Sequence, residues 1–240
     1  MASYTSPIDI KYLSNDHSKQ TTGQKLLQQF LKKNKNNIVN VMDLGCGQGK
    51  TANIFLKANP QIKWAGLDIE DSPQVRKRTL EDSRFHTFDG INIPFKDNSF
   101  DLIYSNQVME HVRHPQELLC EVHRVLKKGG YFIGSTSQFE AYHTFSYWNY
   151  TPFGFITLVE DAQLTLEEIR PSIDGITLLL RAVLGSPRFF GRWWRIESPV
   201  NKLISLYGRI RKRDHRQINA AKMILCGQFS FVIRKENNER

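Results

Sequence analysis

The stretch VMDLGCGQG at residues 41–49 decides the fold class of this 240-residue chain. An apolar run over 38–44 predicts a buried strand, and the glycines at 45, 47 and 49 predict a tight turn at its end. A helical pattern follows over 50–58 and is closed by Asn59-Pro60. Glycines let a backbone approach a ligand closely, and the N–H groups at a helix start favour negative groups. The stretch therefore predicts a ligand-binding turn between a strand and a helix.

Strands and helices alternate on both sides of this turn. Further strands are expected at 63–68, 84–89, 100–105, 131–136, 164–170 and 222–234. Helices are expected within 19–34, at 115–126 and at 152–162. Such alternation predicts parallel βαβ units and an α/β fold with helices on both faces of the sheet.

Composition points to a reduced globular protein. Hydrophobic residues make up 40% of the chain and charged residues 24%, and no apolar run approaches the roughly 18 residues of a membrane span. The first seven residues lack a basic region followed by an apolar stretch, so we expect no secretory signal. The three cysteines are far apart and odd in number, which predicts neither disulfides nor a zinc site. We expect a cytoplasmic protein without a bound metal.

Positive charge is concentrated in one segment. The chain has 33 Lys and Arg against 24 Asp and Glu, a net charge of +9. Residues 172–217 hold ten basic and three acidic residues, so this segment contributes +7 of that excess. Its apolar residues have mostly helical spacing. A basic balance favours nucleic acid, an anionic membrane surface or acidic substrates as partners.

Two common nucleotide-binding patterns fit the glycine-rich turn poorly. A P-loop needs a glycine five residues before Gly49, and Leu44 stands there. A dinucleotide fingerprint needs a third glycine where Lys50 stands. A turn without a ligand remains a further alternative.

The turn and four later segments instead resemble the class I S-adenosylmethionine (SAM)-dependent methyltransferases, in particular their type 11 group. DLGCGQG at 43–49 is similar to the first motif of that family, and GLDI at 66–69 to the second. Three further segments are similar to its later motifs: FDG at 88–90 with IPF at 93–95, SFDLI at 99–103 with VMEHV at 108–112, and EVHRVLKKGG at 121–130. Five motifs in the order of the family make the resemblance specific. It covers residues 38–136 densely and the terminal strand loosely.

The resemblance implies a Rossmann-like three-layer α/β sandwich. Its sheet should be mostly parallel and seven-stranded, with the last strand antiparallel and a helical insertion before that strand. We expect a single methyltransferase domain over 1–240. Within it we expect an N-terminal helical extension (1–36), a SAM-binding core (38–136), an acceptor-side loop (137–151) and a basic helical insertion (172–217).

The resemblance also implies which residues bind SAM. The cofactor carries a sulfonium, an ammonium, a carboxylate, a ribose diol and an adenine, so its site needs several acceptors. The expected binding residues lie in the turn or at strand ends: Asp43, Gly45, Cys46, Gly47, Asp68, Ile69, Asp89, Gly90, Asn106 and Gln107. Asp43 should orient the amino-acid end, Asp68 should accept from the ribose hydroxyls, and Asp89 should accept from the adenine amino group. Capping of the loops is the alternative for all three.

Candidate catalytic and acceptor-binding residues follow the fourth and fifth strands. His111 is the candidate general base, because a neutral imidazole can take a proton near pH 7. His143 is the second candidate. The aromatic stretch after 136 lies at the carboxyl edge of the sheet, where α/β folds bind ligands. Residues there that are expected to bind the acceptor are Tyr142, His143, Tyr147, Trp148 and Tyr150. Packing of this loop onto the core is the alternative. Asp101 is expected to hydrogen-bond to backbone.

The function that these expectations favour is methyl transfer from SAM to a small-molecule, glycan or lipid-linked acceptor, at oxygen. One alternative is an RNA-binding or RNA-modifying methyltransferase that grips phosphates with the insertion. A non-catalytic SAM-binding protein is another. The insertion itself, with the cluster FFGRWWR at 189–195, suits an anionic membrane surface or a homodimer contact, and nucleic acid less well. If the insertion binds an anionic membrane surface, the protein would be located at the periphery of a membrane. We expect the 188–195 cluster to lie away from the cofactor motifs.

Overall fold

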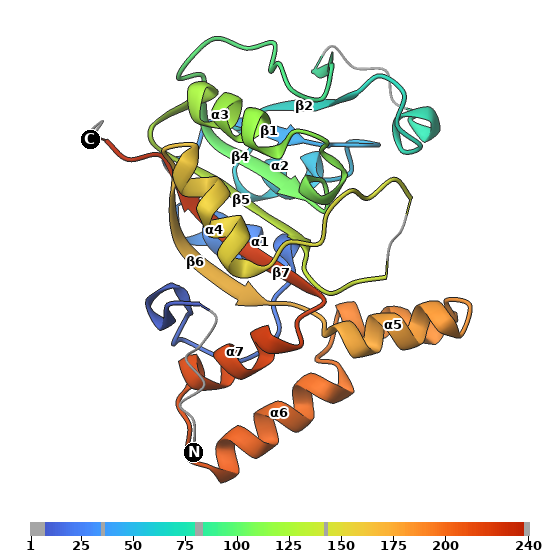
Figure 1. Ribbon diagram of the computed structural model, residues 1–240. Coiled ribbons are helices and arrows are strands. Elements are labelled where there is room, and N and C mark those ends of the chain that lie inside the picture. Colours follow the sequence, from blue (N-terminus) through green and yellow to red (C-terminus); the bar gives the residue numbers. More distant parts are fainter. Residues whose placement is uncertain (1–7, 35–36, 80–83, 142–143, 238–240) are drawn as a thin grey trace.

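A seven-stranded sheet forms the centre of the protein (Figure 1). The computed structural model describes residues 8–34, 37–79, 84–141 and 144–237. The strands are β1 (Asn40–Leu44), β2 (Lys63–Ile69), β3 (Phe85–Phe88), β4 (Phe100–Asn106), β5 (Leu126–Ser137), β6 (Thr165–Pro171) and β7 (Gln228–Arg234). Their order in the sheet is β3-β2-β1-β4-β5-β7-β6. The first five are parallel neighbours, and β7 is antiparallel to both β5 and β6. The predicted mostly parallel sheet with an antiparallel last strand is therefore confirmed.

Helices cover both faces of the sheet. They are α1 (Gly23–Lys33), α2 (Ala52–Ala58), α3 (Pro115–Val125), α4 (Pro152–Asp161), α5 (Gly175–Val183), α6 (Pro199–Ile210) and α7 (His215–Ile224). Short 3-10 helices are η1 (Ile10–Tyr12), η2 (Val75–Lys77), η3 (Met109–His111) and η4 (Arg188–Trp194). Helices α1 and α2 bury Leu27 and Phe55 in the core on one face. Helices α3 and α4 bury Leu119 and Phe155 in the core on the other.

Alternation along β1 places the first acid of the glycine motif. Successive side chains of a strand point to opposite faces. Val41 lies in the core beneath α1 and α2, whereas Met42 and Leu44 lie in the core beneath α3 and α4. Asp43 therefore shares the face of Val41, directly before the turn. The parallel strands bring the carboxyl ends of β1, β2 and β4 to the same edge of the sheet, which positions the candidate site.

The expected strand at 222–234 is wrong in its first part. Residues up to Ile224 belong to α7, and β7 begins at Gln228. Asp214 and Gln217 form a reciprocal capping box that starts this helix. The apolar run that follows Lys222 is short enough to fit either a helix or a strand, and only the cap upstream decides between them. The helical insertion thus continues to Ile224.

The insertion is anchored to the domain through polar contacts. The buried Oε1 of Gln20 accepts from Ser198 N at 2.9 Å and from Asn201 Nδ2 at 3.0 Å. Asp174 caps α5 by accepting from Thr177 N at 2.7 Å, and it also accepts from the Ser198 hydroxyl. Lys222 is fully buried and pairs with Glu197, and burial lowers the pKa of its ammonium. The Gln20 contacts fix the insertion beside the N-terminal segment, and the others hold its helices together.

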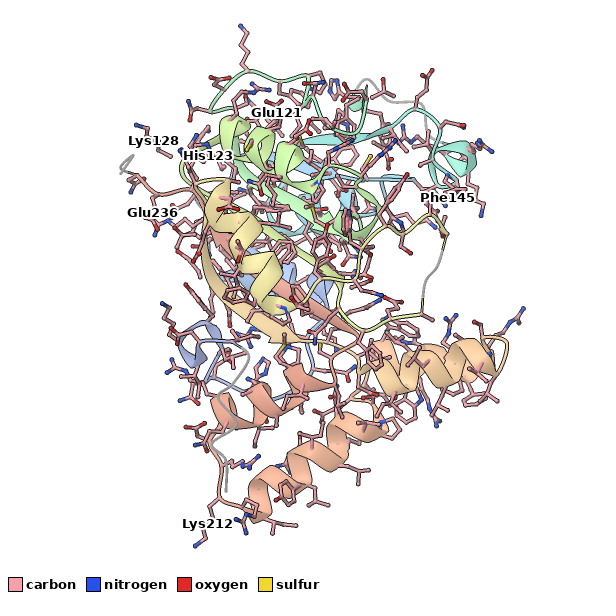
Figure 2. The ribbon with its side chains drawn as sticks, viewed as in Figure 1. Glu121, His123, Lys128, Phe145, Lys212 and Glu236 are labelled. Carbon is pink, nitrogen blue, oxygen red and sulfur yellow. The ribbon has the colours of Figure 1, made fainter. Side chains whose placement is uncertain are left out.

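The ends of the insertion and of the loop after β5 are prominent at the surface. Lys212, just beyond α6, and Phe145, in that loop, lie at two extremities of the molecule (Figure 2). No helix among the described residues combines the length and apolar content needed to cross a membrane.

Replacing Gly134 by alanine should destabilise the fold, because β5 approaches β4 very closely there. A Cβ on Gly134 would lie 1.9 Å from the Ser105 carbonyl oxygen and 2.8 Å from the ring of Phe231. The first contact is with backbone, so β4 and β5 would have to separate. We expect Gly134→Ala to lower the free energy of unfolding, measured by urea titration, by at least about 1–3 kcal/mol. Gly191→Ala is the matched control, since a Cβ there meets nothing within 4 Å. Equal midpoints for the two variants would contradict this account of the sheet.

Candidate functional site

The glycine-rich turn is held by hydrogen bonds from its own backbone. Gly45 and Gly47 have φ angles of 74° and 51°, a region that L side chains rarely adopt. The amides of Gly45 and Cys46 donate to the Leu67 carbonyl at 2.7 and 3.1 Å. The amide of Gly47 donates to Oδ2 of Asp68 at 2.7 Å. The turn after β1 is therefore fastened to the end of β2.

Asp68 is a buried carboxylate at the centre of this arrangement. It is 8% exposed, and its Oδ1 also accepts from the Ile69 amide at 2.9 Å. Burial raises the pKa of Asp68, and the hydrogen bond from Gly47 opposes that rise. Each carboxylate oxygen has a further lone pair that the backbone does not use. Cys46 is buried beside it, and burial raises the pKa of its thiol to about 12, so this residue stays protonated.

Asp43 lies beneath the turn as a second buried acid. It is 2% exposed, and no described residue hydrogen-bonds to its Oδ2. Burial raises its pKa to about 7, and the nearby charge of Asp68 adds to the rise, whereas Trp64 and Thr51 oppose it. A buried carboxyl oxygen without a donor is costly unless something compensates for it. The positive charge of a ligand above the turn would supply that compensation by electrostatic attraction to the carboxyl, so the pair of acids fits the cationic SAM.

Asp89 has a different environment from the other two acids. It is exposed, and its Oδ1 accepts from the amides of Ile91 and Asn92 at 2.9 and 2.7 Å. Its Oδ2 accepts from Asn92 Nδ2 at 2.6 Å, and these bonds lower the pKa of Asp89. The carboxylate thus caps the loop after β3, as in the alternative given above. Gly90 has a φ of 96°, and the space around its α-carbon is nearly open.

Asp101 hydrogen-bonds to backbone, as expected. Its Oδ2 accepts from the amides of Val39 and Asn40 at 3.1 and 2.7 Å. Its Oδ1 pairs with Lys127 at 2.6 Å. It therefore supports the start of β1.

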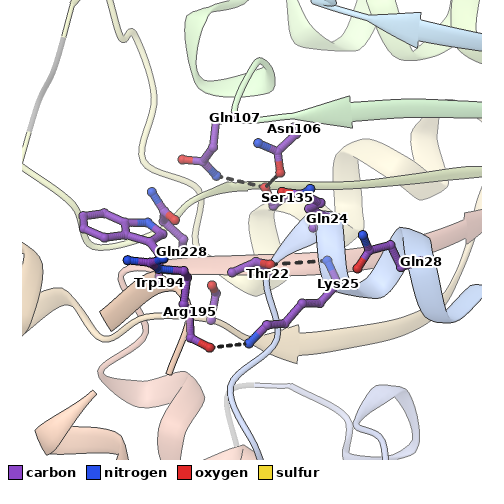
Figure 3. Close-up of a pocket in the computed structure, with 12 residues that line it drawn as sticks. Thr22, Gln24, Lys25, Gln28, Asn106, Gln107, Ser135, Trp194, Arg195 and Gln228 are labelled. Carbon is purple, nitrogen blue, oxygen red and sulfur yellow. Dashed lines mark hydrogen bonds between the residues drawn. The ribbon is translucent and has the colours of Figure 1, made fainter. Parts of the chain in front are cut away.

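A cavity of about 450 Å³ adjoins the end of β4 (Figure 3). Most of its lining side chains are polar: Thr22, Gly23, Gln24, Lys25, Gln28, Asn106, Gln107, Ser135, Ser172, Trp194, Arg195 and Gln228. Ser135 joins the two residues at the end of β4, since it accepts from Gln107 Nε2 at 3.1 Å and donates to Asn106 Oδ1 at 2.9 Å. Lys25 Nζ donates to the carbonyl of Arg195 at 2.8 Å.

This cavity corrects one expectation and reveals residues that the sequence did not point to. The 188–195 cluster was expected away from the cofactor motifs, yet Trp194 and Arg195 share a wall with Asn106 and Gln107. The long-range anchor through Gln20 brings the insertion there, and no local pattern encodes such a contact. The other lining residues lie in α1 or at its N-cap, in β5, just after β6 and at the start of β7, all outside the glycine motif.

The aromatic loop lies beside η3, and none of its described residues lines the cavity. Tyr150 is buried in the core, and its hydroxyl donates to the Met109 carbonyl at 2.9 Å. Trp148 is 45% exposed and donates through Nε1 to the Val112 carbonyl at 2.8 Å, while Tyr147 is 58% exposed. Tyr142 and His143 lie outside the described residues.

His111 ends η3, five residues beyond the end of β4, and it is half-buried. The neighbouring Glu110 is fully buried and accepts from the Thr136 hydroxyl at 3.0 Å. Its carbonyl accepts from the amides of Tyr147 and Trp148, so it ties the aromatic loop to η3. Burial raises the pKa of Glu110 to about 7. The sequence placed this glutamate in a motif but gave no sign of its burial. Among the described residues, no three His, Cys, Asp or Glu side chains gather as a metal site would require.

Comparison with known proteins agrees with this geometry. Residues 42–134 match the family model described as a methyltransferase domain. An uncharacterised methyltransferase of Schizosaccharomyces pombe is 26% identical over 142 residues, which are 53% of this chain and 49% of that protein. A phthiotriol/phenolphthiotriol dimycocerosates methyltransferase of Mycobacterium tuberculosis is 33% identical over 95 residues, 38% of this chain and 35% of that protein. The chain thus spans about half or less of the length of these relatives.

A solved structure shows the same fold over most of the chain. A protein from Galdieria sulphuraria, assigned as a sarcosine dimethylglycine methyltransferase, matches with a TM-score of 0.57 and 15% identity, over 88% of this chain and 86% of that one. The sheet order, the glycine turn and the buried acids at the strand ends fit a Rossmann-like methyltransferase fold. Residues 42–134 therefore form a SAM-dependent methyltransferase domain, and the chain shares the fold of the solved structure.

Replacing Asp43 by asparagine should flatten the pH dependence of stability between about pH 4 and 7. The folded protein raises the pKa of Asp43 from 3.8 to about 7, so its protonated form favours the fold. That stabilisation is fully present below the unfolded pKa and is lost as the pH rises through about 7. The wild type, relative to Asp43→Asn, should lose roughly 1–3 kcal/mol of unfolding free energy over this range, measured by urea titration.

Asp101→Asn provides a control of opposite sign. Burial acts to raise the pKa of Asp101, but Lys127 and the two backbone amides outweigh it, and the net pKa is lowered. Its stabilisation is therefore present above pH of about 4 and is lost as the pH falls through the folded pKa. If the unfolding free energy of the wild type changes with pH just as that of Asp43→Asn does, Asp43 is ionised in the folded protein and its pKa is not raised.

Proposed function

We propose that this protein transfers the methyl group of SAM to a hydroxyl-bearing acceptor held in the cavity between α1 and η4. The observation that carries the proposal is the position of Asn106 and Gln107. Both lie at the carboxyl end of β4, beside the glycine turn of β1, and both also line the cavity. A cofactor on the turn and an acceptor in the cavity would then meet at these two residues.

The proposed SAM-binding residues fit the charge of the cofactor. Asp43 and Asp68 place two buried carboxyls beneath and beside the turn, where a sulfonium and an ammonium would be stabilised. Gly45, Cys46 and Gly47 present backbone to the amino-acid end. Asp68 and Ile69 at the end of β2 bind the ribose, and Asp89 and Gly90 bind the adenine.

The chain contributes alignment and exclusion of water. When bound, SAM supplies an electrophilic methyl group on a sulfonium. Asn106 and Gln107 hold the acceptor in line with that methyl group, and the walls of the cavity exclude water from it. With SAM bound, the acceptor hydroxyl would gain the methyl group as the carbon–sulfur bond breaks, and its proton would pass to a base of this chain. His111, near the same edge of the sheet, is the proposed base.

The lining of the cavity favours a hydroxyl-rich acceptor such as a sugar or polyol head group. Amide side chains can donate and accept at once, which suits hydroxyls. Gln24, Gln28, Gln107 and Gln228 supply four such groups, and the half-buried Trp194 supplies a flat apolar face. The relative from Mycobacterium tuberculosis is named for a lipid acceptor, which supports a lipid-linked form of such a head group. Tyr147 and Trp148 would contact the remainder of a larger acceptor.

Two alternatives give different results in the same assays. An RNA-modifying enzyme would methylate RNA and would bind it with a steep dependence on salt. A non-catalytic SAM-binding protein would bind the cofactor and transfer nothing.

The proposed function is tested with radiolabelled SAM and cell extracts separated into small molecules, glycans, lipids and RNA. Label should enter the glycan or lipid fraction. Asp68→Asn should weaken binding of SAM, and of its demethylated product, by about 30- to 100-fold in calorimetry, because a charged acceptor is lost. Asp71→Asn is the matched control, since this exposed acid lies three residues further on and pairs with Arg76. Label in RNA alone, or equal affinities for the two variants, would refute the proposal.

His111→Asn should keep SAM binding and lose turnover. Asparagine retains a polar tip but cannot take up a proton near neutral pH. Positioned general-base catalysis contributes about 10²–10⁴-fold, so the turnover rate should fall by a comparable factor. The pH–rate profile should also lose its inflection near the ordinary histidine pKa of about 6.5. A decrease below about fivefold with the inflection intact would move the search for the base to His143 and the loop around it.

A further inference from the structure

Helix α6 exposes its apolar side and buries its polar one. The buried residues are Asn201, Ser205 and Gly208. The exposed apolar residues are Leu203 (65%), Leu206 (54%), Tyr207 (55%) and Ile210 (70%). Their spacing of i, i+3, i+4 and i+7 puts them on one stripe of the helix. A surface helix of a globular domain normally has the reverse arrangement, so this stripe is suited to an apolar surrounding.

Helix α5 repeats the pattern. Its exposed apolar residues are Ile176 (37%), Leu180 (52%), Val183 (82%) and Leu184 (58%), again at helical spacing. Phe189 and Ile196, in and beside η4, are 58% and 49% exposed. Helices α5 and α6 contact each other and project together from one end of the sheet (Figure 1). Large apolar side chains gathered in this way at the surface mark an interaction site.

Basic side chains surround the two apolar stripes. Between residues 175 and 213 the basic residues are Arg181, Arg188, Arg192, Arg195, Lys202, Arg209, Arg211, Lys212 and Arg213. Glu197 is the one acid in that range, and it pairs with the buried Lys222. Lys202 and Arg209, seven residues apart, lie along one border of the α6 stripe, and Lys212 lies at its outer end (Figure 2).

We propose that the exposed face of α5, η4 and α6 docks on an anionic lipid bilayer. Apolar residues on one stripe with basic residues along its border are the pattern of a helix that lies in the membrane interface. Aliphatic side chains enter the acyl region, and Lys and Arg reach the head groups from its edge. Trp193 sits beneath this border, with Arg192 and Lys202 over its ring at 4.3 and 5.8 Å.

Charge and apolar area together favour a bilayer over other occupants. A second copy of this face would bring its basic border against an identical border. Nucleic acid would pair with the arginines but would leave Leu203 and Ile210 in water. An anionic bilayer satisfies both the charge and the apolar stripe.

The docked orientation would also bring the acceptor cavity to the lipid surface. Trp194 and Arg195 line that cavity, and they lie in the chain between α5 and α6. A head group in the interface would then reach the cavity without leaving the membrane. Docking itself does not depend on the proposed methyl transfer, so each can fail without the other.

The test is flotation of the whole protein with vesicles of phosphatidylcholine and phosphatidylglycerol in equal parts, and with vesicles of phosphatidylcholine alone. Wild type should float with the anionic vesicles and much less with the neutral ones. Leu203→Gln/Ile210→Gln should weaken binding at least about tenfold. Lys202→Gln/Arg209→Gln should weaken it by about 25-fold. Ile10→Gln/Phe153→Gln is the matched control, since these apolar residues are 43% and 71% exposed outside the insertion, and it should bind as wild type does.

Each remaining outcome overturns the proposal. Failure of the wild type to float excludes the bilayer as the partner. An equal loss in the control variant shows that the face of α5, η4 and α6 is not the docking surface. A concentration-dependent dimer that the Leu203→Gln/Ile210→Gln variant abolishes, without vesicle binding, assigns the face to a second copy. RNA binding that depends on Lys202 and Arg209 alone assigns it to nucleic acid. The substituted side chains are at the surface, so each variant should fold. Calorimetry with SAM checks this, because only a folded variant binds the cofactor, and it reports on the cofactor site separately from the docking face.

Discussion

The hydrogen bond from the Gly47 amide to the Asp68 carboxylate joins the two strands on which the site is built. Parallel pairing brings the end of β1 next to the end of β2, but it does not by itself shape the turn between β1 and α2. The positive φ angles of Gly45 and Gly47 turn their amides toward β2, and Asp68 accepts one of them. Glycine in the turn and an acid at the end of the next strand are therefore parts of one structure. A change in either would alter the surface on which a cofactor rests.

Charge is divided between two ends of the molecule. Two buried acids lie at the glycine turn, where burial keeps their pKa values raised in the absence of a cation. The basic residues gather on the insertion, mostly exposed and beside apolar stripes. A net charge of +9 would by itself disfavour a cationic cofactor, and the two local acids act against that effect at the site. The same protein can in this way present opposite electrostatic surfaces to a cofactor and to an anionic partner.

The insertion has two distinct sides, and its anchoring explains both. It contacts the domain through Gln20, Ser198 and Asn201, which form a buried polar network. Because these hydrogen bonds take the polar side of α6 inward, its apolar stripe is left outside. The segment between α5 and α6 is held at the same time against the end of β4, where Trp194 completes the cavity. The polar network thus links the shape of the cavity to the exposure of the apolar face.

The sequence by itself determined the central α/β domain, because local signals agree with the tertiary structure there. Apolar runs that end in acids or glycines, such as 38–45 and 63–68, specify strands and the edge where their ends meet, whereas the order of the strands in the sheet is seen only in the structure. It did not determine where α7 ends and β7 begins, since an apolar run of a few residues fits either state and a cap decides. The burial of Glu110 and the cavity were likewise decided only in the tertiary structure. Gln20 and Asn201 are far apart in the chain, and a contact of that kind depends on the packing of whole elements, which no local pattern records.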